Sequence, residues 1–570
     1  MELALRNAVI VDGAGGERFS GDIGISEGRV VAVGEVRGCA ASEIELASAV
    51  VAPGFIDVHT HYDAQAFWDP MLSPSSFHGV TTVIAGNCGF TLAPLSGDPA
   101  DTDYLLRMLA RVEAMPLNTL RAALKPTWTD FGSFLAALDG RLAINAVFLV
   151  GHSALRRLVM GDQAVGRSAT KAEIDAMCAL LDRSLAQGGA GFSTTVSYTH
   201  SDGEGRPVPS RWASREELLS LAAVLQRHPG TWVEMVTGKT EMEESDHALM
   251  TDVALAAGRP LNWNLVTVSA RARSAYESQL RASDYAHERG ARVHGLVPAM
   301  PTKVLMNFIT GFLLDSLPGW SEVLLLPKAE KIKALADPRV RRRLESGARR
   351  IEAPALRMML EDWGAITIES VGSGENARWS GRLLADYARA VGRPPIEALF
   401  DLAVMEELNL SFSPPVDGDD DESWRMRADA WRDPRLIVGG SDAGAHLDMI
   451  DSFALSTQLL GEGVRRRRLI DLERAVELIT SVPAARFGLK DRGRIAPGMR
   501  ADLVVFDPDL IDCGPVRMKF DLPQGEPRLY ADALGIDHVI VNGAVAISHG
   551  RPTGRLNGQV LRSGQDTQAV

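Results

Sequence analysis

The feature that most constrains the fold is an alternation of short apolar strands with amphipathic helical segments through the middle of the 570-residue chain. Eight strand candidates alternate with helices, which is the arrangement of a (β/α)8 barrel. In such a barrel the strands are parallel, and the residues at their C-terminal ends carry the chemistry. We therefore predict an α/β fold with a TIM-like barrel. The strand candidates are residues 54–61, 81–89, 144–152, 189–197, 230–238, 260–268, 291–299 and 435–444.

Both ends of the chain are rich in strand signals. Residues 1–54 and 488–570 show alternating apolar residues separated by glycine-containing turns. We predict one small β-sandwich domain built from both termini, with the barrel over residues 55–487. Residues 301–362 are too long for a barrel connection, so we expect an insertion that caps the barrel mouth. The acidic stretch within residues 413–434 predicts a solvated loop.

Charge and cysteine content narrow the class of protein. The net charge of −13 and the pI near 5.5 argue against nucleic acid or an anionic membrane as a partner. Four scattered cysteines do not make a disulfide framework, and the N-terminus lacks the pattern of a signal peptide, so we expect a cytoplasmic protein. No uninterrupted apolar run approaches a membrane span. The expected partner is a small-molecule substrate, and a homo-oligomer is left open.

Two histidines close the first strand candidate. His59 and His61 follow the apolar run 55–58, and residues i and i+2 of a strand project from the same face. Two imidazoles from one rigid element are well placed to bind a metal ion. The alternative is two unrelated histidines in a polar loop. The preceding Pro53-Gly54 turn and the following Asp63 favour the metal.

Two further strand ends carry candidate ligands. Cys88 lies between glycines in residues 86–89, and Asp442 lies among small residues in 440–446. A thiolate is a strong ligand for Zn²⁺, although an isolated buried cysteine more often packs in a core. A carboxylate at the end of the last strand can contact a metal and accept a proton, although a turn-capping aspartate is the usual alternative. The neighbouring histidine pair favours the chemical role for both residues.

Taken in order, the segments PGFIDVHTHYD, GVTTVIAGNCGF, VGHSALR, GSDAGAH and GRIAPGMRADLVVFD resemble the amidohydrolase superfamily. More narrowly, they resemble its N-acyl-D-amino-acid deacylase (D-aminoacylase) branch, of which the cysteine in GNCG is a specific mark. The similarity spans essentially the whole chain. It implies a metal-dependent (β/α)8 hydrolase with a β-sandwich built from both termini. It also implies His59 and His61 as metal ligands, Cys88 as a bridging or shared ligand, and Asp442 as the catalytic acid and base.

The chain departs from the deacylase pattern at two strand ends. Deacylases of this branch have a histidine at the end of the fifth strand and another at the end of the sixth, and these hold a second zinc ion. Glu234 and Asn264 stand at those positions here, and Val266 stands where a substrate-binding lysine is expected. A carboxylate can bind zinc, but a neutral amide is a poor ligand. We therefore expect one tightly bound Zn²⁺, and Glu234 as the ligand of any second, weakly held ion. If the site holds one metal, Glu234 instead lies behind the direct ligands or meets a polar part of the substrate.

The expected reaction is hydrolysis of an amide-type C–N bond, most like N-acyl-amino-acid deacylation, with metal-activated water and Asp442 as general base and acid. Four residues at or just beyond strand ends are candidate substrate-binding groups: His152, Tyr198, Asn264 and His446. For His152, a hydrogen bond to another site residue is an equal alternative. Three other functions remain open: hydrolysis of a cyclic amide, carbamate or urea; a non-hydrolytic lyase; and an inactive scaffold, against which the intact Asp442 argues.

Overall fold

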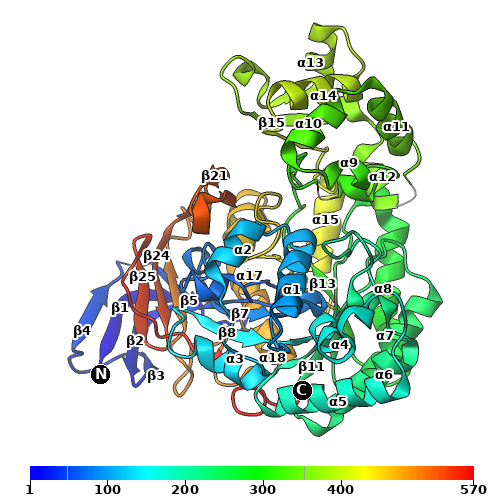
Figure 1. The fold of residues 1–570 in the computed structure, drawn as a ribbon. Coiled ribbons are helices and arrows are strands. Elements are labelled where there is room, and N and C mark those ends of the chain that lie inside the picture. The colour runs from blue at the N-terminus through cyan, green and yellow to red at the C-terminus, as the bar shows by residue number, and fades with distance from the viewer. Residues whose placement is uncertain (48, 312, 352–353) are drawn as a thin grey trace.

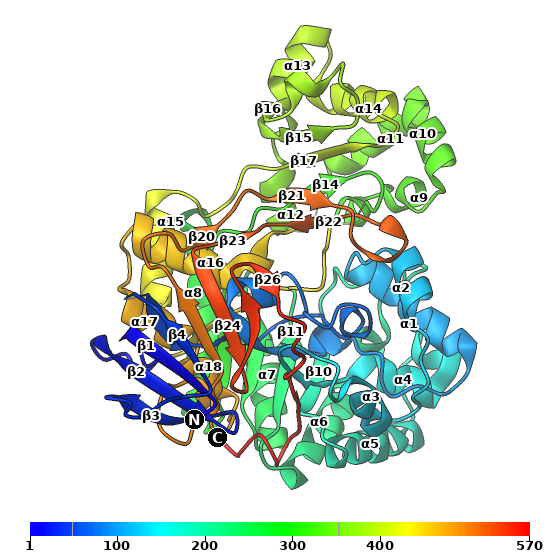
Figure 2. The same cartoon turned by 90° about the vertical axis from the view of Figure 1, so that its left-hand side faces the viewer.

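The computed structural model of the protein describes residues 1–47, 49–311, 313–351 and 354–570. A central α/β region carries a sheet that joins the two chain ends on one side. A separate unit rises from the opposite end of the molecule (Figure 1, Figure 2). None of the helices in the described part of the chain is both long and apolar enough to cross a membrane.

All eight predicted central strands are confirmed, and they pair in parallel. They lie in two sheets, of order β27–β8–β7–β6 and β18–β13–β12–β11–β10–β9. Both sheets draw on one continuous segment, residues 145–151, because only Leu149 separates β8 from β9. At the other edges, Thr60 after β6 forms a parallel bridge with Ala443 after β18. The strands are β6 (Phe55–Asp57), β7 (Val80–Ala85), β8 (Asn145–Phe148), β9 (Val150–Gly151), β10 (Gly191–Thr195), β11 (Trp232–Val236), β12 (Leu261–Asn264), β13 (Val293–Val297), β18 (Leu436–Val438) and β27 (Val560–Leu561).

Helices connect these strands and bury one apolar face each. In α5, Ile174, Met177, Leu181 and Leu185 recur at helical spacing and are buried. The hydroxyl of Thr170 begins this helix by accepting a hydrogen bond from the N–H of Glu173. The helices of the region are α1 (Pro99–Val112), α2 (Leu117–Ala123), α3 (Phe131–Leu138), α4 (His152–Met160), α5 (Lys171–Ala186), α6 (Arg215–Val224), α7 (Glu244–Ala257), α8 (Arg273–Glu288), α15 (Asp421–Ala430), α16 (Leu455–Gln458), α17 (Leu472–Leu478) and α18 (Ser481–Arg486).

The prediction of a solvated loop within residues 413–434 is wrong. Helix α15 occupies most of this stretch because the Asp420 carboxylate accepts hydrogen bonds from the N–H groups of Glu422 and Ser423. Trp424 is buried on the same helix. The acidic run is therefore a helix start, where negative charge is favourable.

A nine-stranded sheet combines strands from both ends of the chain. Its order is β26–β25–β24–β19–β5–β1–β2–β3, with β4 paired to β1, so the antiparallel β5–β19 pair joins the two halves. Leu5, Ile25, Val51 and Val505 are among the residues of its core. The strands are β1 (Leu3–Ile10), β2 (Phe19–Ser26), β3 (Arg29–Gly34), β4 (Ser42–Glu45), β5 (Val50–Pro53), β19 (Leu503–Phe506), β24 (Ile536–Val541), β25 (Ala544–Ser548) and β26 (Arg551–Pro552).

The expected insertion, residues 301–362, forms part of a larger unit that continues to Ser413. This unit has its own core, in which the rings of Trp320, Phe400 and Phe412 pack around Phe308. It extends past residue 362 because α14 and β17 supply half of that aromatic cluster. Its elements are β14 (Met306–Asn307), α9 (Ser321–Leu324), α10 (Lys328–Ala336), α11 (Pro338–Ala348), α12 (Pro354–Leu360), β15 (Thr367–Val371), β16 (Arg382–Leu383), α13 (Leu384–Val391), α14 (Pro395–Met405) and β17 (Leu410–Ser413).

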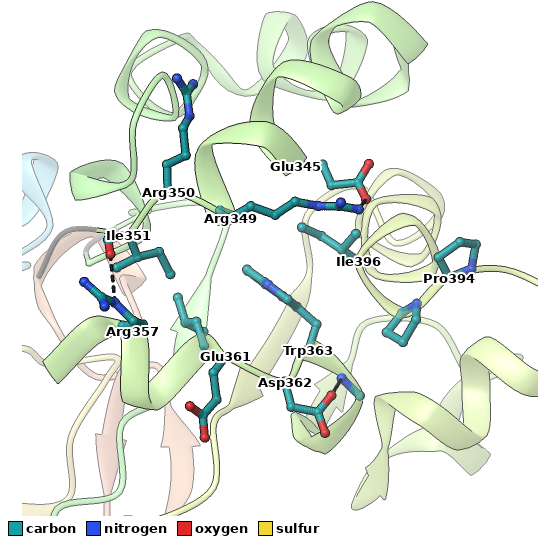
Figure 3. A pocket seen from close by; sticks show the side chains of 14 residues that line it. Glu345, Arg349, Arg350, Ile351, Arg357, Glu361, Asp362, Trp363, Pro394 and Ile396 are labelled. Atoms are coloured by element: carbon teal, nitrogen blue, oxygen red, sulfur yellow. Dashed lines mark hydrogen bonds and ion pairs between the residues drawn. The ribbon is translucent and has the colours of Figure 1, made fainter. Parts of the chain in front are cut away.

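A pocket of ≈ 930 Å³ lies within this inserted unit (Figure 3). Its charged lining is largely engaged: Arg349 pairs with Glu345, and the Arg357 Nε donates to the carbonyl of Ile351. No histidine or cysteine lines it. None of the residues predicted to form the functional site lies in this pocket.

Candidate metal centre

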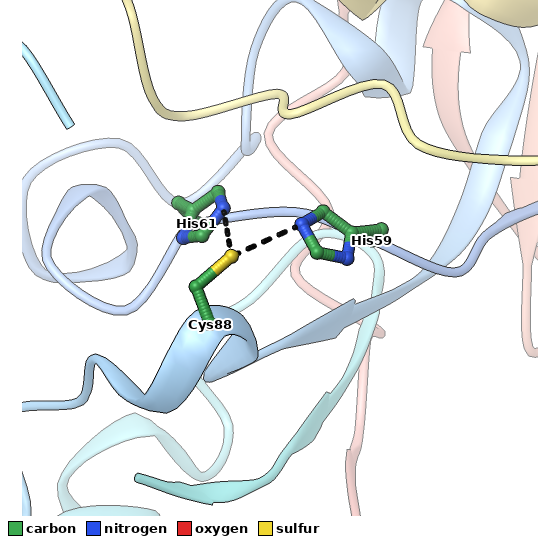
Figure 4. A group of neighbouring side chains, drawn as sticks. All are labelled: His59, His61 and Cys88. Atoms are coloured by element: carbon green, nitrogen blue, oxygen red, sulfur yellow. Dashed lines mark hydrogen bonds between the residues drawn. The ribbon is translucent and has the colours of Figure 1, made fainter. Parts of the chain in front are cut away.

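Two strand ends bring three predicted ligands together. His59 and His61 follow β6, and Cys88 lies in the short turn after β7 (Figure 4). The Cys88 Sγ lies 3.5 Å from the His59 Nε2 and 3.8 Å from the His61 Nε2. One donor atom of each residue lies within 4.8 Å of the other two, and all three residues are buried. The two imidazoles thus lie together, as the H-x-H pattern predicted, and the thiol faces both.

Asp442 approaches the same two nitrogens from β18. Its Oδ1 lies 3.0 Å from the His59 Nε2 and 3.5 Å from the His61 Nε2. Donors bound tetrahedrally at about 2.0–2.3 Å from one zinc ion lie roughly 3.3–3.8 Å apart. The measured separations agree with that range to within a few tenths of an ångström. His59, His61 and Cys88 therefore form a group that could hold one divalent ion, and Asp442 lies within reach of both imidazoles.

The backbone of the Cys88 turn explains why the thiol points at the histidines. Cys88 has a left-handed φ of 58°, between Gly86 and Gly89, which also have positive φ. A Cβ at position 86 would lie 2.5 Å from the carbonyl oxygen of Leu149, so only glycine fits. The Asn87 amide donates to the carbonyls of Thr60 and Ile84, which ties the turn to the histidine strand.

The other ring nitrogen of each histidine faces a buried carboxylate. The His61 Nδ1 lies 3.4 Å from the Glu113 Oε1, and the His59 Nδ1 lies 3.9 Å from the Glu234 Oε1. The second oxygen of Glu234 accepts a hydrogen bond from the Cys88 N–H at 2.7 Å. Sequence reasoning missed Glu113, because it follows α1 as its C-terminal cap and not a strand. Only the fold brings it to the centre.

The charges of the centre are strongly coupled. Burial lowers the pKa of His61, but Glu113 and Asp442 outweigh burial and raise it to about 9. Burial would raise the pKa of Asp442, but hydrogen bonds with His59 and His61 hold it well below its usual value. Burial raises the pKa of Glu234 to about 8. Burial and the nearby carboxylates raise the pKa of Cys88 well above its usual value, so a bound cation is needed to displace its proton.

The four candidate substrate-binding residues occupy different surroundings. The Asn264 Nδ2 lies 3.3 Å from the His59 Nε2, at the centre itself. His446 lies beside Glu113, and its Nε2 is 3.9 Å from the Glu113 Oε2. The Tyr198 side chain is 45% exposed, on the loop after β10. His152 is fully buried, and its two ring nitrogens contact Thr194 and Glu217. Asn264 is thus in contact with a candidate metal ligand, whereas His152 contacts groups away from the centre.

Comparisons with known proteins agree with this geometry. The Amidohydrolase family model matches residues 42–547. N-acyl-D-aspartate deacylase and N-acyl-D-glutamate deacylase from Alcaligenes xylosoxydans xylosoxydans are each 28% identical to the chain. Each alignment covers 99% of this chain, with 95% and 96% of the relatives. The solved structure of N-acyl-D-glutamate deacylase from Bordetella bronchiseptica, complexed with zinc and a phosphonate inhibitor, is 27% identical, with a TM-score of 0.66. That alignment covers 99% of this chain and 100% of that one.

The match over most of the chain shows the family, and the deacylase relatives show the branch. The structural relatives bind divalent metal, which agrees with the group of His59, His61 and Cys88 described above. The chain belongs to the amidohydrolase family, in its D-aminoacylase-like branch, and is a hydrolase of carbon–nitrogen bonds other than peptide bonds.

Proposed function

We propose that this protein is a metal-dependent hydrolase that removes the acyl group from an N-acyl amino acid, with Asp442 as general base and acid. The observation that carries the proposal is the convergence of His59, His61, Cys88 and Asp442, with N···S distances of 3.5 and 3.8 Å and N···O distances of 3.0 and 3.5 Å. The deacylase relatives support the substrate class, because their names give N-acyl-D-amino acids as substrates.

The proposal includes a closed (β/α)8 barrel. The two parallel sheets share residues 145–151, and at their other edges Thr60 bridges Ala443. The Asp442 N–H also donates to the His59 carbonyl at 3.2 Å. These contacts support closure of eight strands, with the candidate residues at the C-terminal ends where barrel enzymes place their chemistry.

The proposed domain division follows from the three cores. Residues 1–54 and 488–570 form the small β-domain and a C-terminal tail, whose strand β27 pairs with β8, and the barrel spans residues 55–487. We propose an insertion over residues 301–413, since the separate core of that unit includes Phe412. The hydrogen bond from the Asn307 amide to the Asp448 carboxylate links this insertion to the loop that follows Asp442.

The residues of the centre fit zinc better than magnesium or calcium. Two imidazoles and a thiol are nitrogen and sulfur donors, whereas magnesium and calcium select oxygen donors. We propose that His59, His61 and Cys88 hold one Zn²⁺ tightly and that Asp442 contacts it. A divalent ion held here lowers the pKa of a water that binds it and polarises the carbonyl under attack.

The protein's own residues then move the proton. Asp442 is ionised at neutral pH, since its pKa lies well below the usual value, and so can accept the proton of the attacking water. The C–O bond forms, the C–N bond breaks, and Asp442 delivers the same proton to the leaving nitrogen, which gives a carboxylic acid and an amine. Asn264 and His446 lie where they could contact the substrate beside the metal, whereas the contacts of His152 suit a structural role.

The test combines metal analysis with a substrate panel. The purified protein would be assayed for zinc, then incubated with N-acyl amino acids of both hands, cyclic amides, carbamates and ureas. We expect release of a free amino acid from at least one N-acyl compound, abolished by chelation and restored by Zn²⁺. Turnover confined to the cyclic amides, carbamates or ureas would contradict the proposed substrate class and leave the metal chemistry intact.

A further inference from the structure

The two ligand histidines are held in the same way. Each directs Nε2 toward the Cys88 thiol and the Asp442 carboxylate, and each turns Nδ1 toward a different buried glutamate. The glutamates come from unrelated elements: Glu234 from the middle of β11 and Glu113 from the end of α1. Both side chains are almost completely buried, with exposures of 0% and 3%.

We propose that Glu234 and Glu113 are positioning residues, each orienting one ligand imidazole, and that the centre is built for a single metal ion. This inference rests on the metal site of the proposed function and on no choice of substrate. A carboxylate that accepts the Nδ1–H of a histidine fixes the ring tautomer and leaves the Nε2 lone pair free for a metal. Such a pairing also makes the imidazole a stronger ligand.

The contacts of Glu234 favour this role over direct metal binding. Its Oε2 is engaged by the Cys88 N–H at 2.7 Å, so one oxygen already holds the turn that presents the thiol. Its Oε1 and the His59 Nδ1 are both buried and lack hydrogen-bond partners within the described residues. They lie 3.9 Å apart, so a small rotation of either side chain joins them. Glu234 thereby ties two ligands, His59 and Cys88, to the same strand.

Asn264, which lies beside His59, adds little to a second metal site. It is a neutral amide, which is a poor zinc ligand, and its Nδ2 lies 3.3 Å from the His59 Nε2. Among the described residues, the group whose donor atoms all lie within 4.8 Å of one another is His59, His61 and Cys88, with Glu234 and Asp442 outside it.

Glu113 holds the second histidine against a different part of the chain. Its Oε1 lies 3.4 Å from the His61 Nδ1, and its Oε2 lies 3.9 Å from the His446 Nε2. Its backbone carbonyl accepts a hydrogen bond from the His446 N–H at 2.6 Å. The end of α1 therefore supports both His61 and the loop that follows Asp442.

Zinc stoichiometry and affinity test the inference without any substrate. We expect one zinc ion per wild-type chain after exhaustive dialysis, measured by elemental analysis. Glu234→Gln and Glu113→Gln keep the size of the side chain and replace the carboxyl group with a neutral amide. Each should weaken zinc binding about 10–100-fold, measured by competition with a chromogenic chelator, while one ion still binds at saturating zinc.

Glu406→Gln is the matched control. Glu406 is a buried glutamate of the inserted unit that bonds to Ser373 and Asn376, away from the metal centre. The zinc affinity of the Glu406→Gln variant should equal that of the wild type. Thermal melting of all metal-free variants, followed by circular dichroism, reports whether the fold is intact. Two dialysis-resistant ions in the wild type and one in Glu234→Gln would make Glu234 a ligand and overturn the inference. Wild-type zinc affinity in both folded site variants would overturn it equally.

Discussion

Two buried networks in the central region both contain histidine and glutamate. They differ in whether every buried polar atom has a hydrogen-bond partner. Beside α4, Glu217 accepts hydrogen bonds from His152 and Arg156, and Thr194 satisfies the other nitrogen of His152. All three charged or titratable groups have partners. At the metal centre, by contrast, the His59 Nδ1 and the Glu234 Oε1 are buried and lack hydrogen-bond partners within the described residues.

The difference indicates what each network is for. A buried polar group without a partner costs free energy, so a protein core normally completes its hydrogen bonds. The Glu217 network does so and stabilises the fold by itself. The His59 network concentrates carboxylates, imidazoles and a thiol around one point, which a bound cation would balance.

The largest effect is expected from removing both ligand histidines. The double variant His59→Ala, His61→Ala should lose metal retention and activity completely while the central α/β region stays folded, because Cys88 and Asp442 alone make a weak site. Elemental analysis and circular dichroism check this together. Stoichiometric zinc in the double variant would place the metal elsewhere.

Asp442→Asn keeps the shape of the side chain and removes the base. The rate should fall by about 10²–10⁴, which is roughly 2.7–5.5 kcal/mol of barrier, while the histidines retain the metal. Steady-state kinetics with zinc analysis measures both quantities. If Asp442 only caps its turn, stability would fall by about 1 kcal/mol with turnover nearly unchanged.

Cys88→Ser replaces a thiolate ligand with a neutral hydroxyl. Zinc affinity should fall by more than the roughly 10–100-fold expected for loss of an outer hydrogen-bond partner. Chelator competition on the dialysed protein measures the change. The other cysteines serve as controls, and Cys178→Ser should leave zinc affinity unchanged. Wild-type zinc affinity in Cys88→Ser would mean that Cys88 packs in the core and does not bind the metal.

Glu217→Gln should affect stability and not metal binding. The substitution leaves the buried Arg156 charge without a carboxylate, which typically costs about 3–5 kcal/mol. Urea unfolding measures the loss, and elemental analysis should find wild-type zinc content. A fall in zinc affinity as large as that of Glu234→Gln would show that the two networks are coupled.

The pH dependence of stability should differ in sign between the networks of the metal-free protein. Burial lowers the pKa of His152, despite Glu217. The contribution of His152 to the free energy of unfolding is therefore complete above a pH of about 6.5 and is lost as the pH falls. Burial also lowers the pKa of His61, but Glu113 and Asp442 raise it to about 9. Its contribution is complete below pH of about 6.5 and is lost as the pH rises toward 9.

Each of two single substitutions should remove the pH dependence of stability on one side of the profile. His152→Gln should flatten the acid side of the stability profile, and His61→Gln the alkaline side, by up to about 1.4 kcal/mol per pH unit for one proton. Urea unfolding of the metal-free proteins across the pH range gives both slopes. Unchanged slopes in both variants would contradict the assigned signs.

Local patterns in the sequence predicted the strands and the ligands that a strand end positions. His59 and His61 could be predicted as a pair because residues i and i+2 of one strand share a face, whatever the rest of the chain does. Cys88 and Asp442 could be predicted because each follows an apolar strand, and neighbouring parallel strands end on one side of a sheet. The same local rules failed at residues 413–434, where Asp420 starts a helix.

The sequence by itself therefore determined the central strands, the strands of both chain ends and the four donors that converge on the candidate metal site. Only the tertiary structure decided that Glu113 belongs to the centre and that Glu234 faces the Nδ1 of His59 with one oxygen bound to the Cys88 N–H. It also decided that His152 serves a closed structural network. The physical reason is that periodicity and turn chemistry act between neighbours in the chain, whereas these contacts arise when separate elements pack against one another.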